Sequence, residues 1–203
     1  MYRNTFLLFL FFLFVTDISL AGDSLYFKLH FVYGSKPLHK FKRSEPKYFG
    51  GIHGGHVYME VDRDIFSFGL HNGQWHIIAH KKKIVGQYRI DSNLVWCGDT
   101  GKLKITTISI PITKQQLTEF KHLEKNYLQT APYDYAFIGM RCAAGAYDVL
   151  SRVGICKQRS RIGIITKNFY PKRLRIKLLR RAKNEHWPVE KQQGRPTRKW
   201  EKD

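Results

Sequence analysis

Two side chains in this chain could perform nucleophilic chemistry together: a cysteine at the start of a predicted helix and a histidine at the start of a predicted strand. Cys142 follows Arg141 and opens a run of small residues. A helix N-terminus and a neighbouring cation both favour a thiolate, so we expect a lowered pKa for the Cys142 thiol. The alternative is that Cys142 is a small apolar core residue, the usual fate of a free cysteine.

The candidate histidine is His56, which directly follows Gly54 and Gly55. Two glycines remove steric bulk at this point, so a thiol carried on a helix could approach the imidazole. His56 is therefore the predicted general base for Cys142.

A third polar group would orient the imidazole. If Arg63 and Asp64 form a two-residue turn, His56 falls opposite His71 on the next strand, where paired side chains are in contact. A shift of one residue in register would place Leu70 or Asn72 there instead. Asn72 would still serve, and Glu60 is a further candidate.

The pattern of apolar residues predicts the elements that must position these side chains. Alternating or β-branched runs predict strands, at 25–31, 56–62, 65–70, 75–79, 84–90 and 103–110. The second, third and fourth of these look like a meander. Between the first and second strands, 34–55 is predicted to be a long exposed loop.

Three helices are predicted in the second half of the chain. Thr113 and Gln116 have the spacing of a capping box, and apolar residues then recur at helical spacing until Pro132. A second helix is expected over 142–153, with small residues that permit close packing on the sheet and Gly154 past its end. A third, over 171–183, opens with proline and has a strongly cationic polar face.

This order of elements and motifs resembles the circularly permuted papain-like superfamily, which includes NlpC-type peptidases, lecithin:retinol acyltransferase-like enzymes and bacterial lipoprotein acyltransferase relatives. Gly55-His56-Val57 and Arg141-Cys142-Ala143 carry the resemblance at residue level, within a layout that covers 25–154. The resemblance implies an α+β fold with an antiparallel sheet packed against the cysteine-bearing helix. It also implies that Cys142 is the nucleophile, His56 the base and His71 the third member, and that no cofactor is needed.

The first 21 residues are predicted to be a signal peptide that is cleaved before Gly22. Arg3 precedes a short apolar run, and Ser19-Leu20-Ala21 fits the small residues of a cleavage site. We therefore expect a secreted, periplasmic or cell-envelope protein. The remaining chain is expected to form one domain over 22–188, followed by a basic, extended tail over 189–203.

The chain carries an odd number of cysteines, Cys97, Cys142 and Cys156. In an oxidising compartment, a bond between Cys97 and Cys156 would leave Cys142 as the free thiol. A reducing compartment would leave all three free, and sequence does not fix the pairing.

The chain is strongly basic, with a net charge of +19 and a pI of about 10.0. Outside the cytoplasm this charge attracts anionic lipid or envelope polymer, and export disfavours nucleic acid as a partner. The sequence thus predicts a thiol hydrolase or acyltransferase acting on an acyl or peptide substrate, of cell-wall or lipoprotein origin. The alternative is a non-catalytic envelope-binding protein that uses the cationic helix 171–183, Trp187 and the tail around Trp200.

A metal site is a further alternative. His53 and His56 have H-x-x-H spacing and could bind a transition metal with His71 or Asp62. Nothing else in the sequence completes a ligand set, so we expect no metal.

Overall fold

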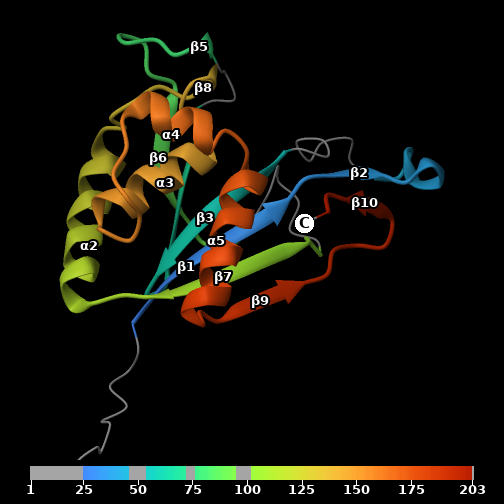
Figure 1. Ribbon diagram of the computed structural model, residues 1–203. Helices are drawn as coiled ribbons and strands as arrows, with labels where there is room; N and C mark the ends of the chain where they lie inside the picture. The colour runs from blue at the N-terminus through green and yellow to red at the C-terminus, as the bar shows by residue number, and fades with distance from the viewer. Residues whose placement is uncertain (1–24, 46–53, 72–75, 95–101, 203) are drawn as a thin grey trace, which may run out of the picture.

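The computed structural model describes residues 25–45, 54–71, 76–94 and 102–202. This part of the chain is a mixed α+β fold, with four α-helices on one face of a six-stranded antiparallel sheet (Figure 1). The predicted signal peptide, His53, Asn72 and Cys97 lie outside the described residues. None of the described helices is both long and apolar enough to cross a bilayer.

The main sheet has the strand order β6-β4-β3-β1-β7-β9. All of its neighbouring strands are antiparallel. Its strands are β1 (Tyr26–Tyr33), β3 (Gly55–Val61), β4 (Asp64–Leu70), β6 (Gly86–Asp91), β7 (Ile105–Pro111) and β9 (Val189–Gln192).

The helices are α2 (Lys114–Gln129), α3 (Cys142–Arg152), α4 (Arg161–Lys167) and α5 (Pro171–Glu185). The short elements are β2 (Ser35–Pro37), η2 (His39–Phe41), β5 (His76–Ile78), β8 (Ala136–Ile138) and β10 (Arg198–Trp200). The sequence therefore predicts α2, α3 and α5 correctly, and misses α4 and β8. The predicted loop 34–55 contains β2 and η2.

Alternation along β1 explains how the sheet separates two cores. Phe27, Leu29 and Phe31 are fully buried on the face that the helices cover. Val32 points the other way and joins a smaller cluster with Tyr58 of β3 and Ile105 of β7. The strands β1, β3 and β7 thus contribute to both cores, according to their period of two.

The start of α2 is capped as predicted. The Thr113 N–H donates to Oε1 of Gln116 at 3.0 Å, and the Gln116 N–H donates to Oγ1 of Thr113 at 3.1 Å. The reciprocal bonds satisfy two donors that the helix itself leaves unpaired.

The predicted meander is wrong in its third strand. The strand β5 pairs in parallel with β8 and forms a separate two-stranded sheet. The place beside β4 is taken by β6, with Gly69 opposite Gln87.

Over its described residues, 189–202, the segment predicted to be a tail over 189–203 is folded against the rest of the protein. The strand β9 pairs with β7, and β10 pairs with β2 (Figure 1). Trp187, expected at a membrane surface, is 8% exposed and packs against Arg181. The apolar side of α5 faces the core through Leu174 and Leu178.

A buried ion pair fastens this last segment to α5. The Arg175 guanidinium lies 3.7 Å from the centroid of the Tyr33 ring, and its Nη2 donates to Glu201 Oε2 at 3.1 Å. Both charged side chains are at most 1% exposed. Burial makes each charge depend on the other, because neither is hydrated.

We predict that Glu201→Ala lowers the free energy of unfolding by about 3–5 kcal/mol, because it leaves Arg175 buried without its counter-charge. Glu185→Ala is the matched control. It breaks the exposed Arg181–Glu185 pair and should cost about 0–1 kcal/mol. Chemical denaturation measures both, and equal losses would contradict the assignment.

Candidate functional site

The first residue of α3 is Cys142, and α3 is pressed unusually close to the sheet. A Cβ added at Gly145 would lie 3.0 Å from the Phe68 Cβ and 3.0 Å from the Tyr88 hydroxyl. A Cβ at this position would force its neighbours to shift, which agrees with the prediction that the small residues of 142–146 permit close packing on the sheet. The start of the helix thereby reaches the strands beneath it.

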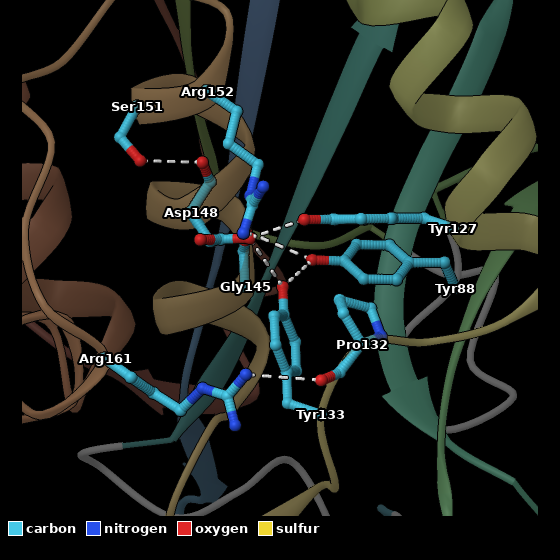
Figure 2. A network of polar contacts seen from close by, with 9 residues as sticks. All are labelled: Tyr88, Tyr127, Pro132, Tyr133, Gly145, Asp148, Ser151, Arg152 and Arg161. Atoms are coloured by element: carbon cyan, nitrogen blue, oxygen red, sulfur yellow. Dashed lines mark hydrogen bonds and ion pairs between the residues drawn. The ribbon is translucent and has the colours of Figure 1, made fainter.

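A buried polar network holds α3 in this position (Figure 2). The carboxylate of Asp148 accepts hydrogen bonds from Tyr127 of α2 at 2.8 Å and from Arg152 at 3.0 Å. The hydroxyl of Tyr133 lies 3.4 Å from the same oxygen and is also hydrogen-bonded to that of Tyr88. The network ties α3 to α2 and to β6, about 9 Å along the helix axis from Cys142.

The sulfur of Cys142 lies beside the backbone N–H of Val57 in β3. That N–H, with those of Ala143 and Cys142 itself, favours the thiolate. The direction of the Val57 N–H follows from the sheet. The backbone N–H and C=O groups of successive residues in a strand point to opposite neighbouring strands. The Tyr33 N–H bonds to the Lys104 carbonyl on the β7 side, so the backbone groups of Val32 point to β3, where Val32 pairs with His56. The next residue, Val57, therefore turns its N–H toward β4.

The strands β3 and β4 pair from Tyr58–Ser67 to Val61–Asp64. The amide of Val57 lies one residue beyond the first of these pairs. The Cys142 side chain, which is 4% exposed, thus lies near the point where the pairing of the two strands ends.

The imidazole of His56 lies on the face of the sheet opposite α3. Its ring centroid is 4.5 Å from that of Tyr58, which belongs to the cluster on that face. The structure therefore brings the backbone of His56 near the Cys142 sulfur. The thiol and the imidazole lie on opposite faces of the sheet, at the point where β3 and β4 separate.

The glycine before His56 has a specific role. Gly55 has a φ of +100°, and a Cβ there would lie 2.2 Å from the Val32 carbonyl oxygen. A side chain at this position is excluded by the neighbouring strand and by the backbone conformation. Gly55 lets β1 and β3 close together beside His56, rather than admitting the thiol as the sequence suggests.

The predicted pairing of His56 with His71 is wrong. The turn consists of Asp62 and Arg63, with a φ of +58° at Asp62, so Val61 pairs with Asp64. Aspartate tolerates this left-handed conformation better than most residues. The register moves by two residues and, extended along the strands, places Gly69 opposite His56.

The third-member candidates lie away from the His56 imidazole. His71 is exposed, and its Nδ1 is 2.8 Å from Oε1 of Gln87. Glu60 lies four residues along β3 and binds His30 and Lys28, each at 2.8 Å. Four residues of strand span about 13 Å, so Glu60 does not reach His56.

His56 and its neighbour Gly69 are both buried on the far face of the sheet. Gly69 lies beside it in the extended register, and a Cβ placed at Gly69 would find no described atom within 4 Å. Beyond Gly69 in the same row lies Gln87, about 10 Å from His56 across two strand spacings. Sequence reasoning missed Gln87, because nothing local marks it as a neighbour of His56.

The predicted lowered pKa of Cys142 is also wrong. Burial raises the pKa of the thiol, and the Arg141 guanidinium and the nearby N–H groups offset this only in part. For His56, burial together with the charge of Arg89 lowers the pKa to about 3. Both groups are therefore uncharged near neutral pH.

Sequence reasoning also missed Tyr135. Burial raises the pKa of its hydroxyl, the Cys142 thiol raises it further, and Arg141 and the Cys142 N–H oppose the shift. The Tyr135 hydroxyl therefore lies close to both the thiol and the start of α3. Its position just before β8 gave no signal of this contact.

The described residues contain no group of three or more histidine, cysteine, aspartate or glutamate side chains that could hold a metal ion. Of the cysteines they include, Cys142 and Cys156 are both free thiols. Cys156 is therefore not bonded to Cys97 in this structure, and Cys97 itself lies outside the described residues.

Comparisons with protein family models, with curated proteins and with solved structures find no match for this chain. Functional assignment therefore depends on the geometry of the site itself.

We predict that Cys142 is alkylated by iodoacetamide more slowly at neutral pH than an ordinary free thiol. The rate should rise only at pH values above the pKa of an ordinary thiol. Arg141→Gln should move the rise to still higher pH, because it removes a charge that favours the thiolate. Peptide mass spectrometry at position 142 measures the rate. Fast labelling at mildly acidic pH would contradict the raised pKa.

Proposed function

We propose that this protein is a thiol-dependent hydrolase or acyltransferase, in which Cys142 attacks an acyl carbonyl and His56 moves the proton. The observation that carries the proposal is the Cys142 sulfur at the Val57 amide, next to His56 and at the separation of β3 and β4. The order of sheet, histidine strand and cysteine helix also fits the permuted papain-like arrangement that the sequence resembles.

The reaction would start from a neutral pair. As the sulfur attacks the carbonyl carbon, we propose that a water molecule at the separation of β3 and β4 relays the thiol proton to the His56 imidazole on the opposite face, so no thiolate needs to persist in the resting protein. The tetrahedral oxyanion would meet the N–H groups at the start of α3, with the Tyr135 hydroxyl close by. Imidazolium then protonates the leaving group, and a Cys142 thioester remains.

The second half of the cycle determines the class of enzyme. Water attacking the thioester gives a hydrolase, and an amine or hydroxyl of a second substrate gives an acyltransferase. A peptide, cell-wall or lipoprotein-derived acyl group would be suitable, and an exported protein would meet it in the cell envelope.

We predict that an activated aryl ester, such as p-nitrophenyl acetate, leaves an acyl group on Cys142. His56→Ala should slow this acylation by about 10²–10⁴-fold, the usual contribution of a general base. Intact-mass and peptide analysis locate the adduct, with Cys156→Ala as the control that removes another thiol. Acylation that is lost in Cys156→Ala but kept in Cys142→Ala would exclude the proposal, and so would a full rate without His56.

The same assay has an expected pH dependence. Because the pKa of His56 is lowered to about 3, the imidazole is already in its basic form throughout the range from pH 5 to 7. The rate of acylation should therefore show no acid limb near pH 6.5, the ordinary histidine value.

We predict that Gly69→Val reduces acylation by ester without changing the unfolding midpoint. The new side chain would point to the face of the sheet that carries the His56 imidazole, no described atom lies within 4 Å of a Cβ at Gly69, and Gly69 has no strained backbone that requires glycine. Gly145→Val is the structural contrast, because it should destabilise the fold by forcing α3 away from Phe68. Undiminished acylation in Gly69→Val would show that substrate does not approach on this face.

A further inference from the structure

The small β5–β8 sheet exposes large apolar side chains at one end of the molecule. Ile77 is 65% exposed, Ile78 70%, Phe137 45% and Ile138 58%. Figure 1 shows β5 and β8 projecting beyond the end of the six-stranded sheet. These four residues, here called the apolar tip, are contributed by two strands far apart in sequence and paired side by side.

Hydrogen bonds to a buried carboxylate anchor the apolar tip to the rest of the protein. The carboxylate of Asp134, which is 3% exposed, lies 2.5 Å from Nδ1 of His76 and accepts the N–H groups of His80 and Val85 at 2.8 Å each. Burial alone would raise the pKa of Asp134, but these bonds outweigh it and lower the pKa. One buried carboxylate thus fixes both ends of the segment that presents Ile77 and Ile78.

Cationic side chains border the apolar tip. The chain leaves β5 through His80 and the run Lys81, Lys82 and Lys83, all of them exposed, and Ile84 follows at 43% exposure. A protruding aliphatic surface edged by lysines complements a bilayer with anionic headgroups: the apolar groups enter the acyl boundary and the ammonium groups remain at the phosphate level.

We propose that the apolar tip, with Lys81–Lys83, docks this protein on an anionic lipid bilayer. Exposed apolar groups of this size and grouping mark interaction sites. The bordering positive charge, in a chain of net charge +19, selects an anionic membrane over a neutral apolar partner. This surface differs from the α5 and Trp187 surface expected from sequence, whose apolar residues are buried in the core.

Docking on this surface would present the start of α3 to the bilayer. The Arg141 guanidinium lies 5.5 Å from the ring centroid of Phe137 in the apolar tip, and the next residue is Cys142. If the proposed thiol chemistry is also correct, the acyl donor is membrane-borne. Docking itself does not require that chemistry, so Cys142→Ala should bind vesicles as the wild type does.

Sedimentation with phosphatidylcholine vesicles, with and without phosphatidylglycerol, tests the proposal. The wild type should bind only the anionic vesicles, and added salt should weaken binding. Ile77→Gln/Ile78→Gln should weaken it about tenfold or more. Ile90→Gln, on β6 and 47% exposed, is the matched control and should bind normally.

The charge contribution has its own matched pair. Lys81→Gln/Lys82→Gln should weaken binding by about tenfold or more, at roughly 1 kcal/mol for each lysine near the surface. Lys114→Gln/Lys125→Gln removes the same charge from α2 and should have a much smaller effect. Equal losses in the two lysine pairs would mean diffuse attraction by the whole protein, and would overturn the proposal.

A soluble polyanion distinguishes a bilayer from an envelope polymer. Heparin needs no apolar contact, so the isoleucine pair should bind it as the wild type does while losing vesicle binding. Vesicle binding that survives in the isoleucine pair would contradict the proposal. The isoleucine and lysine substitutions are all at exposed positions, and unchanged unfolding midpoints verify that the fold is kept.

Discussion

The geometry of the site depends on how closely α3 approaches the sheet. Gly145 lies against Phe68 and Tyr88 with no room for a side chain, and the carboxylate of Asp148 holds the helix from two neighbouring elements. A helix standing further off would leave Cys142 above the sheet, in the core. Because the approach is close, the sulfur instead reaches the backbone amide of Val57, at the edge where β3 and β4 separate.

The same closeness determines the electrostatics of the site. Removing water from the thiol raises its pKa more than Arg141 and the helix start can lower it, and burial also keeps His56 neutral. The resting pair is therefore of the neutral nucleophile and neutral base kind, rather than a preformed thiolate and imidazolium. Such a site is protected from adventitious alkylation and depends on substrate to start proton transfer, in keeping with our proposal of acyl chemistry.

Local sequence signals predicted what local physics determines. The capping box of α2 and the proline that begins α5 both act within a few residues of themselves, and the run of small residues in α3 is visible in the sequence although it packs against distant strands. The register of β3 and β4 was mispredicted because Asp62 adopts a left-handed conformation that composition does not reveal. The last segment was predicted to be a tail because it is polar. Its sequence does not show that Glu201 is buried against Arg175 of α5. The pKa of Cys142 was mispredicted because sequence shows the neighbouring charge but not the depth of burial.

The central claim is that the Cys142 sulfur lies at the Val57 amide beside a neutral His56. Nuclear magnetic resonance of the ¹⁵N-labelled protein tests it directly, with Cys142→Ala as the matched control. We expect the Val57 amide signal to follow the titration of the Cys142 thiol, above the ordinary thiol range, and to lose this response in Cys142→Ala. The imidazole nitrogens of His56 should remain neutral down to about pH 4, consistent with its lowered pKa. A Val57 amide that is indifferent to Cys142, or an imidazole that protonates near pH 6.5, would contradict the account.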